Sequence, residues 1–111
     1  MDAEQLLNQL GLHSYDGRGF VLTIYAVDLL MEYGEDTFPN LKRLHQAVSQ
    51  KYPCSYDVFL SEIHKISQIA WERDAKRVCK YASRDLEYEP TASDFIDILY
   101  VYLSRHQPGK I

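Results

Sequence analysis

The sequence predicts an all-α domain, a compact multi-helix arrangement around a helix-turn-helix. Apolar residues recur at three- and four-residue steps along most of the chain, which is the spacing of one face of an α-helix. No pair of segments shows the alternation of apolar and polar side chains that marks strands. With 111 residues and 46% hydrophobic content, the chain can bury one core. Residues 1–111 are therefore predicted to form a single domain.

Two helices are predicted before residue 35. Asp2 can cap a short first helix, which is expected to stop at Gly11. The second helix is expected to begin near Arg18 and to end at Gly34. The positions expected to face the core are Leu6, Leu7 and Leu10 in the first helix and Phe20, Ile24, Val27 and Met31 in the second. Residues 35–40 then form a connection.

Residues 41–71 carry the pattern of a helix-turn-helix with a tight break at 52–55. The apolar stripes on either side of the break are Leu41, Leu44, Val48 and Tyr52, then Phe59, Ile63, Ile66 and Ala70. Pro53 cannot continue the first helix, whereas Ser55 can cap the second, with Asp57 near its positive end. The second helix of this motif can enter the DNA major groove while the first crosses the phosphates. Two helices joined by a short turn also occur in ordinary helical bundles.

The chain after Trp71 is expected to form a shorter basic helix to about Tyr81, followed by a polar crossing at 83–90. Thr91, with Asp94 three residues later, predicts a capping-box start for a final helix. That helix is expected to end before Pro108-Gly109.

The predicted final helix is apolar nearly all round, apart from Asp97. A helix of this kind must be covered on more than one side. We expect it to form the centre of the core against the second helix. The functional alternative is that one edge, at Tyr100 or Val101, contacts another subunit or RNA polymerase.

Charge is distributed unevenly along the chain, although the net charge is only -4. Residues 1–40 hold seven acidic and one basic side chain, whereas residues 41–80 hold four acidic and eight basic ones. The candidates for DNA phosphate contacts are Lys42, Arg43 and Lys51 around the first helix of the motif, and Arg73, Lys76, Arg77 and Lys80 after Trp71. A solvated helix surface is the alternative explanation of such a cluster.

The polar side of the second helix of the motif supplies the candidate base contacts. These are Ser55, Asp57, Ser61, His64, Lys65 and Gln68. Gln68 can pair with adenine, Ser61 and His64 can donate or accept at base edges, and Lys65 can reach guanine or phosphate. Asp57 and Glu72 would repel phosphates unless they point away. We therefore expect modest affinity for double-stranded DNA, supported by the flanking cations.

Enzymatic, metal-dependent and membrane classes find little support in the sequence. It contains no Gly-rich phosphate loop and no paired-His metal motif, so neither catalysis nor a cofactor is expected. The lone histidines are interpreted as surface or packing residues: His13, His45, His64 and His106. Cys54 and Cys79 are expected to be ordinary reduced thiols. No segment approaches the roughly 20 apolar residues of a membrane span, and no secretory signal begins the chain, so a cytoplasmic protein is expected.

Four segments in order resemble one protein family. They are Arg18-Gly19-Phe20, the helix at 44–52, the helix at 63–73, and Glu89-Pro90-Thr91-Ala92-Ser93-Asp94-Phe95-Ile96. From about Leu6 to about Leu103, the chain resembles the C-terminal DNA-binding effector domain of the sporulation-initiation response regulator of endospore-forming Firmicutes. The resemblance implies a winged-helix-like effector domain, built around a helix-turn-helix, that activates or represses early sporulation genes.

The sequence departs from this family where DNA contacts would be made. The positions that match the arginines and glutamate of the family's recognition helix hold Leu60, Ser61 and His64, with Lys65 beside them, and Glu89 replaces a basic residue. An inherited fold with an altered DNA preference is therefore expected.

The family also places a phosphoacceptor receiver domain before this effector domain, whereas here the first helix begins close to Met1. The chain is thus expected to be either a fragment or a standalone effector. A standalone effector can act as a homodimer or in a mixed dimer with a full-length regulator. The alternative function is a degenerate effector domain that serves as a protein-protein interaction module or modulator of such a regulator.

Overall fold

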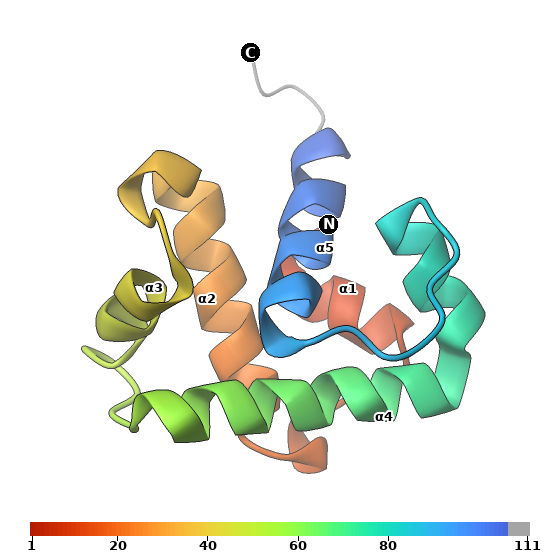
Figure 1. The fold of residues 1–111 in the computed structure, drawn as a ribbon, viewed down its shortest axis with the longest axis horizontal. Coiled ribbons are helices and arrows are strands. Elements are labelled where there is room, and N and C mark those ends of the chain that lie inside the picture. Colours follow the sequence, from red (N-terminus) through yellow and green to blue (C-terminus); the bar gives the residue numbers. More distant parts are fainter. Residues whose placement is uncertain (107–111) are drawn as a thin grey trace.

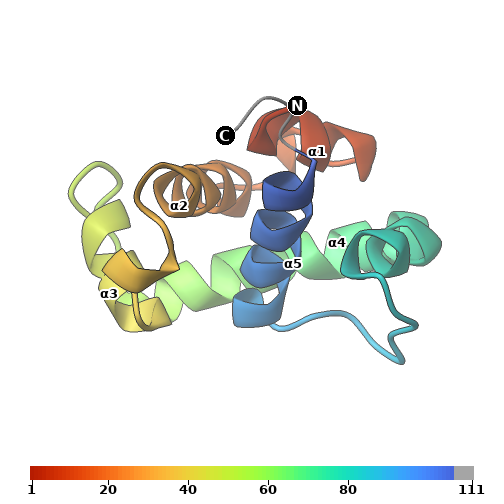
Figure 2. The same ribbon diagram turned by 90° about the horizontal axis from the view of Figure 1, so that it is seen from above.

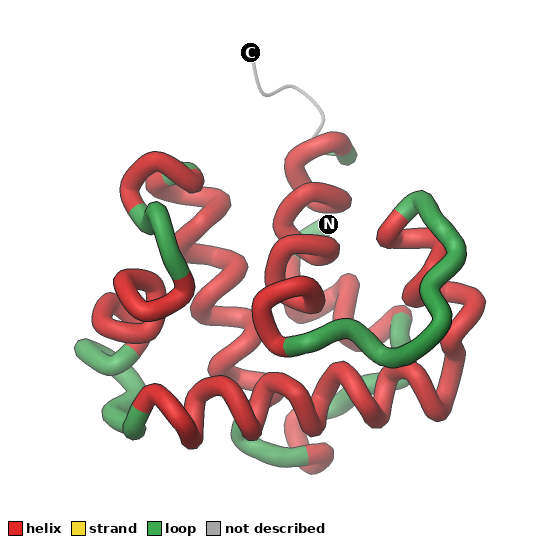
Figure 3. Tube along the Cα trace, viewed as in Figure 1, coloured by secondary structure: helices red, strands yellow, loops and turns green. Residues whose placement is uncertain are grey.

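The computed structural model describes residues 1–106, and this part of the chain contains helices and no strand (Figure 3). The α-helices are α1 (Ala3–Gln9), α2 (Gly19–Tyr33), α3 (Leu41–Val48), α4 (Tyr56–Ala82) and α5 (Ala92–Arg105). Two short 3-10 turns, η1 (Ser14–Asp16) and η2 (Glu35–Thr37), lie on either side of α2. The all-α prediction is confirmed. Helix α5 ends at Arg105, before Pro108-Gly109 as predicted, and that pair itself lies outside the described residues. Between residues 1 and 106, no helix has both the length and the apolar character needed to span a bilayer.

The long helix α4 forms the base on which α2 and α5 pack (Figures 1 and 2). Helix α3 lies beside the start of α4, and α1 packs against α2 and α5. The largest fully buried side chains come from every helix and from the segment after α1: Phe59, Phe95, Leu6, Leu7, Leu10, Leu12, Ile63, Ile66, Leu99, Leu103, Val27 and Val48. The helices therefore share one apolar core, whose burial is the main source of stability.

The predicted helix caps are present. Asp2 and Gln5 form a reciprocal capping box at α1, and Gly11 takes a positive φ of 81° just after that helix. Ser55 caps α4 and Thr91 caps α5, in each case by accepting a hydrogen bond from the backbone N–H three residues later. The capping box predicted for Thr91 and Asp94 is only half formed, because the Asp94 carboxylate does not accept from the Thr91 amide. Short-range signals thus place the starts of three helices.

Helix α2 buries a wider face than predicted. Phe20 and Val27 are buried as expected, but Ile24 and Met31 are only half-buried. The face instead includes Leu22, Thr23, Ala26 and Leu30. Because α2 contacts α1, α3, α4 and α5, a single helical stripe cannot cover all of its neighbours.

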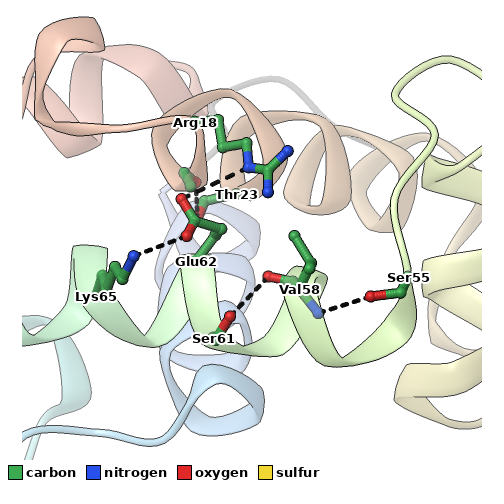
Figure 4. Close-up of polar contacts among 8 residues, drawn as sticks. Arg18, Thr23, Ser55, Val58, Ser61, Glu62 and Lys65 are labelled. Carbon is green, nitrogen blue, oxygen red and sulfur yellow. Dashed lines mark hydrogen bonds and ion pairs between the residues drawn. The ribbon is translucent and has the colours of Figure 1, made fainter.

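Gly19 brings the start of α2 into close contact with α4. A Cβ atom at this position would lie 2.6 Å from the carbonyl carbon of Glu62 and 2.7 Å from Cγ1 of Ile66. The hydroxyl of Thr23 donates to the Gly19 carbonyl at 2.6 Å, which is among the contacts drawn in Figure 4. The Arg-Gly-Phe segment is therefore the place where two helices approach without room for a side chain.

The connection between α3 and α4 differs from the predicted tight turn. Helix α3 ends at Val48, so Tyr52 does not continue its apolar stripe, and residues 49–55 form the link. A proline disfavours helical geometry in the preceding residue, so Pro53 prevents the helix from continuing through Tyr52. The Tyr52 ring packs edge-on against Tyr25 of α2, with centroids 5.5 Å apart.

Helix α4 is interrupted at Asp74, whose φ and ψ of -159° and 70° are not helical. The carboxylate of Asp74 accepts a hydrogen bond from the backbone N–H of Arg77 at 3.1 Å, as an N-cap does. The predicted basic helix after Trp71 is thus the second segment of α4, 75–82, and its boundary lies at Asp74. Trp71 itself is half-buried against the core, three residues before the break.

Helix α5 occupies the centre of the core, as predicted. It contacts α1, α2 and α4 and buries six side chains, namely Ala92, Phe95, Ile96, Ile98, Leu99 and Leu103. Tyr100 and Val101 are half-buried, so the edge on which the functional alternative depends remains partly open to solvent.

Candidate nucleic-acid interface

His45 holds α3 against the start of α4. Its Nε2 lies 2.7 Å from the carbonyl oxygen of Cys54 and 2.9 Å from the hydroxyl of Ser49. Its ring packs on Tyr56 and Phe59, with centroid separations of 5.4 and 5.2 Å. His45 is therefore a packing residue, one of the two roles expected for it, and it positions the two helices of the predicted motif.

The apolar stripe of α4 faces inward as predicted, because Phe59, Ile63, Ile66 and Ala70 are all buried. A row of exposed side chains follows the opposite side of the helix, and we call it the α4 ridge. The ridge consists of Asp57, Ser61, Lys65 and Glu72. Two of its members are acidic and one is basic, so the ridge alone carries no excess of positive charge for DNA.

Two predicted base contacts use their hydroxyl groups within the helix. Ser55 accepts from the Val58 amide at 3.1 Å in its capping role, and Ser61 donates to the Val58 carbonyl at 3.2 Å (Figure 4). The Ser61 side chain remains exposed, and its hydroxyl still has acceptor capacity. Ser55 is the helix start rather than a point on the ridge.

Glu62 links Lys65 to a cation that the sequence interpretation did not include among the contacts. The Lys65 ammonium lies 2.9 Å from the Glu62 carboxylate, and Nε of Arg18 lies 3.7 Å from it, as Figure 4 shows. The Arg18 side chain is 61% exposed, so it extends the basic surface beside the ridge. No local pattern marks Arg18, because the contact that places it beside α4 joins segments far apart in the sequence.

His64 and Gln68 lie on the side of α4 that the polar crossing covers. Nε2 of His64 is 3.9 Å from the Glu89 carboxylate, and the Gln68 amide donates to the same carboxylate at 3.4 Å. The crossing is anchored nearby, where the buried Ser67 hydroxyl donates to the Pro90 carbonyl at 2.7 Å. Both predicted base contacts are therefore half-buried beside an acid, apart from the exposed ridge.

Three predicted phosphate contacts lie around α3, and we call them the α3 cations: Lys42, Arg43 and Lys51. Lys42 lies over the ring of Tyr56 at 5.9 Å, and Lys51 over the ring of Tyr25 at 5.1 Å. All three side chains are exposed, and none forms an ion pair with any residue in the range 1–106. They are free to meet an external anion.

The other four predicted phosphate contacts lie near or beyond the break, and we call them the distal cations: Arg73, Lys76, Arg77 and Lys80. Arg73 forms a two-pronged ion pair with Asp16 at 2.9 Å and also donates to the Gly11 carbonyl. Arg77 pairs with Asp74 at 3.3 Å and donates to the Gln9 carbonyl. Both arginines thus fasten the N-terminal segment to α4.

The Arg73 contact also affects titration. The hydrogen bonds from Arg73 lower the pKa of Asp16 below its ordinary value, against the opposing effect of burial. The same hydrogen bonds raise the pKa of Arg73. Only 6% of the Asp16 side chain is exposed, so the pair is closed on the carboxylate side and partly open on the guanidinium side.

The two sets of cations lie at opposite ends of α4 (Figure 1). At 1.5 Å per residue, about 27 Å of helix separates position 56 from the break at position 74. The structure therefore brings the α3 cations together with Lys65 and the start of the ridge, but it places the distal cations elsewhere.

The thiols and possible metal ligands form no further site. Cys54 and Cys79 are both free, and no group of three or more His, Cys, Asp or Glu side chains suited to a metal ion occurs in the described range. His13 stacks on Tyr15 and His106 on Tyr102, in keeping with the surface or packing roles expected for them.

Comparison with known proteins adds no relative. No family model, curated protein or solved structure matches this chain. The likeness to the sporulation effector domain therefore stays a prediction that rests on the quoted segments.

Proposed function

We propose that this chain is a sequence-specific DNA-binding transcriptional regulator related to sporulation initiation. The observation that carries the proposal is the arrangement at the start of α4. There, an exposed helical ridge begins beside three cations that have no ion-pair partner within residues 1–106. A ridge of this kind suits the major groove, and cations beside it suit the flanking phosphates.

In the proposed complex, Ser61 and Lys65 lie nearest the base edges, since both are exposed on the ridge. A hydroxyl can donate to or accept from any base, whereas an ammonium favours guanine or a phosphate. The α3 cations and Arg18 then contact phosphates on either side of the helix. This assignment gives Arg18 a role that the linear charge pattern did not suggest.

The acidic residues limit the affinity of this surface. Asp57 and Glu72 belong to the ridge, and Glu89 lies beside two of the predicted base contacts. Each would raise the energy of a nearby phosphate, because like charges repel. We therefore expect modest affinity, a strong dependence on salt, and a base preference that differs from that of the family it resembles.

A second candidate is a protein-interaction module, such as a modulator that forms mixed dimers with a full-length regulator. The observation that favours it is the Glu89 carboxylate against Gln68 and His64, because this contact occupies side chains that would otherwise read bases. Under this alternative, the fold is kept and the phosphate contacts are unused.

Selection from a pool of randomised duplexes tests the proposal. The winning duplex and a scrambled control are then titrated at low and high salt. We expect an enriched motif and a steep fall in affinity with salt. No enrichment, with only feeble binding at low salt, would favour the interaction module.

A matched pair of variants tests whether the α3 cations contribute to DNA binding. Arg43→Ala should weaken binding of both duplexes and reduce the salt slope by about 1, as expected for one lost phosphate contact. Arg105→Ala removes the same exposed charge at the far end of α5 and should leave the titration unchanged. Equal losses in both variants would indicate a nonspecific effect of net charge.

A further inference from the structure

A groove of about 470 Å³ lies between α5 and the segment that joins α2 to α3. Apolar side chains from α2, the joining segment, α3 and α5 line it: Leu30, Phe38, Leu41, Leu44, Ile96 and Tyr100. Figure 1 shows this part of the fold, where η2 and the start of α3 stand opposite α5. The groove is large enough to receive a bulky apolar side chain from outside, which would lie on the half-buried Phe38, Leu41 and Tyr100.

Acidic side chains surround this apolar lining. Glu35 and Asp36 contribute from η2 and Asp97 from α5, and all three are exposed. None of them forms an ion pair with any residue in the described range, and no lysine or arginine lines the groove. We call this feature the acidic groove. Its charge opposes phosphate binding, which separates it from the proposed DNA surface.

We propose that the acidic groove binds a basic segment of a partner protein. One apolar side chain of that segment, such as leucine, phenylalanine or tryptophan, lies on the apolar lining. Lysine or arginine residues beside it pair with Glu35, Asp36 and Asp97. Charge complementarity selects basic segments and guides their approach, while burial of the apolar side chain supplies most of the affinity.

Residues 1–106 of a second copy are a poorer occupant than a basic segment of a different protein. Among residues 1–106, the exposed large apolar side chains are Met1, Tyr15, Tyr33 and Tyr88. Each of the four has an acidic residue directly beside it in the sequence. None of the four is flanked by a lysine or an arginine, so none supplies the pair of side chains that the groove requires.

The two distal arginines do not change this conclusion. Arg73 and Arg77 are already engaged with Asp16 and Asp74 within the same chain. A head-to-tail contact through them would leave two acids without partners, and it would not close into a discrete oligomer unless the rotation between copies allowed it.

Selection of displayed short random peptides on the full chain tests the proposal. We expect enrichment of peptides that place lysine or arginine within a few residues of one leucine, phenylalanine or tryptophan. A synthetic peptide of the enriched sequence, and a version with its basic residues replaced by glutamate, serve as probes in a binding titration. Enrichment of acidic or purely apolar peptides would overturn the proposal.

Two matched double variants then locate the site. Glu35→Gln with Asp97→Asn removes two charges from the acidic groove, and Asp85→Asn with Glu87→Gln removes two exposed charges from the polar crossing. The groove variant should weaken peptide binding about tenfold and the crossing variant less than about twofold. Equal losses would contradict a specific site.

Amide chemical shifts provide a readout that does not depend on the variants. Peptide-induced shifts should concentrate at residues 35–44 and 93–100, while the spectrum of each variant reports whether it is folded. Shifts centred elsewhere would contradict the site.

Sedimentation of the chain alone tests whether a second copy of the chain occupies the groove. Self-association that disappears in the groove variant would overturn the proposed partner in favour of a second copy. Failure of the peptide test would leave the DNA selection unaffected, since the two interactions use different side chains, even where both lie on α3.

Discussion

The two ends of α4 carry similar numbers of basic side chains but use them differently. Around α3, all three cations lack ion pairs within residues 1–106, whereas at the far end both arginines hold the N-terminal segment in place. The sequence shows one continuous basic stretch. In the structure, its first part is a surface that can bind an external anion, whereas the arginines of its last part bind residues of the N-terminal segment. Charge density along a chain therefore does not by itself define a binding site.

The largest effect is expected from a change at Gly19, because a side chain there would break the close contact between the start of α2 and α4. Gly19→Ala should destabilise the fold by about 3 kcal/mol, since the new methyl group meets the α4 backbone at Glu62. Urea unfolding of the variant and of wild type measures the loss. Ser61→Ala, on the exposed ridge, is the control and should change stability by less than about 0.5 kcal/mol. Similar stability of the two variants would mean that the helices can separate without cost.

The second prediction compares the two ends directly in DNA binding. Lys42→Ala with Arg43→Ala should weaken binding to the selected duplex about tenfold and lower the salt slope by about 2. Lys76→Ala with Lys80→Ala removes the same charge from the far end and should weaken binding by about threefold or less, because both residues follow the break at Asp74, far along α4 from the start of the ridge. Fluorescence anisotropy at several salt concentrations measures both. A larger loss for the far pair would reverse the assignment of the two ends.

The third prediction concerns the contact of Arg73 with the N-terminal segment. Arg73→Met should lower the midpoint of thermal unfolding by a few degrees, because it removes the pairing with Asp16 and the bond to the Gly11 carbonyl. Lys76→Met, a neighbouring exposed cation without an ion pair in the described structure, should leave the midpoint nearly unchanged. Circular dichroism gives both midpoints. If the two variants behaved alike, Arg73 would have no structural role beyond its charge.

The smallest expected effect is a pH dependence of the same contact. The pKa of Asp16 is lowered in the folded state, so its contribution to stability is present above the ordinary value of 3.8 and is lost as the pH falls through the lowered pKa. The stability difference between wild type and Asp16→Asn should therefore be largest near neutral pH and shrink on acidification below 3.8. Urea unfolding across this pH range measures the difference. A gap that stays constant at all pH values would assign the effect to packing rather than to the ion pair.

Features that depend on near neighbours in the chain could be predicted from sequence. The caps at Asp2, Ser55 and Thr91 use partners three residues away, and the buried stripe of α4 follows from helical spacing alone. The central position of α5 followed from the near absence of a polar face. These features need no knowledge of the tertiary structure.

Features that join distant segments could not be predicted in this way. Arg73 meets Asp16 across 57 positions, and Gln68 meets Glu89 across 21. No local pattern selects those partners, so the candidate site contained residues that are engaged elsewhere and omitted Arg18. The length of the link after α3 was also missed, because apolar spacing at Tyr52 suggested a helix that Pro53 prevents.

Trp71 has a consequence for how this protein can be observed. It is the single tryptophan of the chain, and it lies half-buried just before the break at Asp74. Tryptophan emission from the unlabelled chain therefore originates at one known turn of helix, between Lys65 of the α4 ridge and three of the distal cations, Lys76, Arg77 and Lys80. A spectral shift on adding DNA or denaturant would report on that turn directly, without any attached dye.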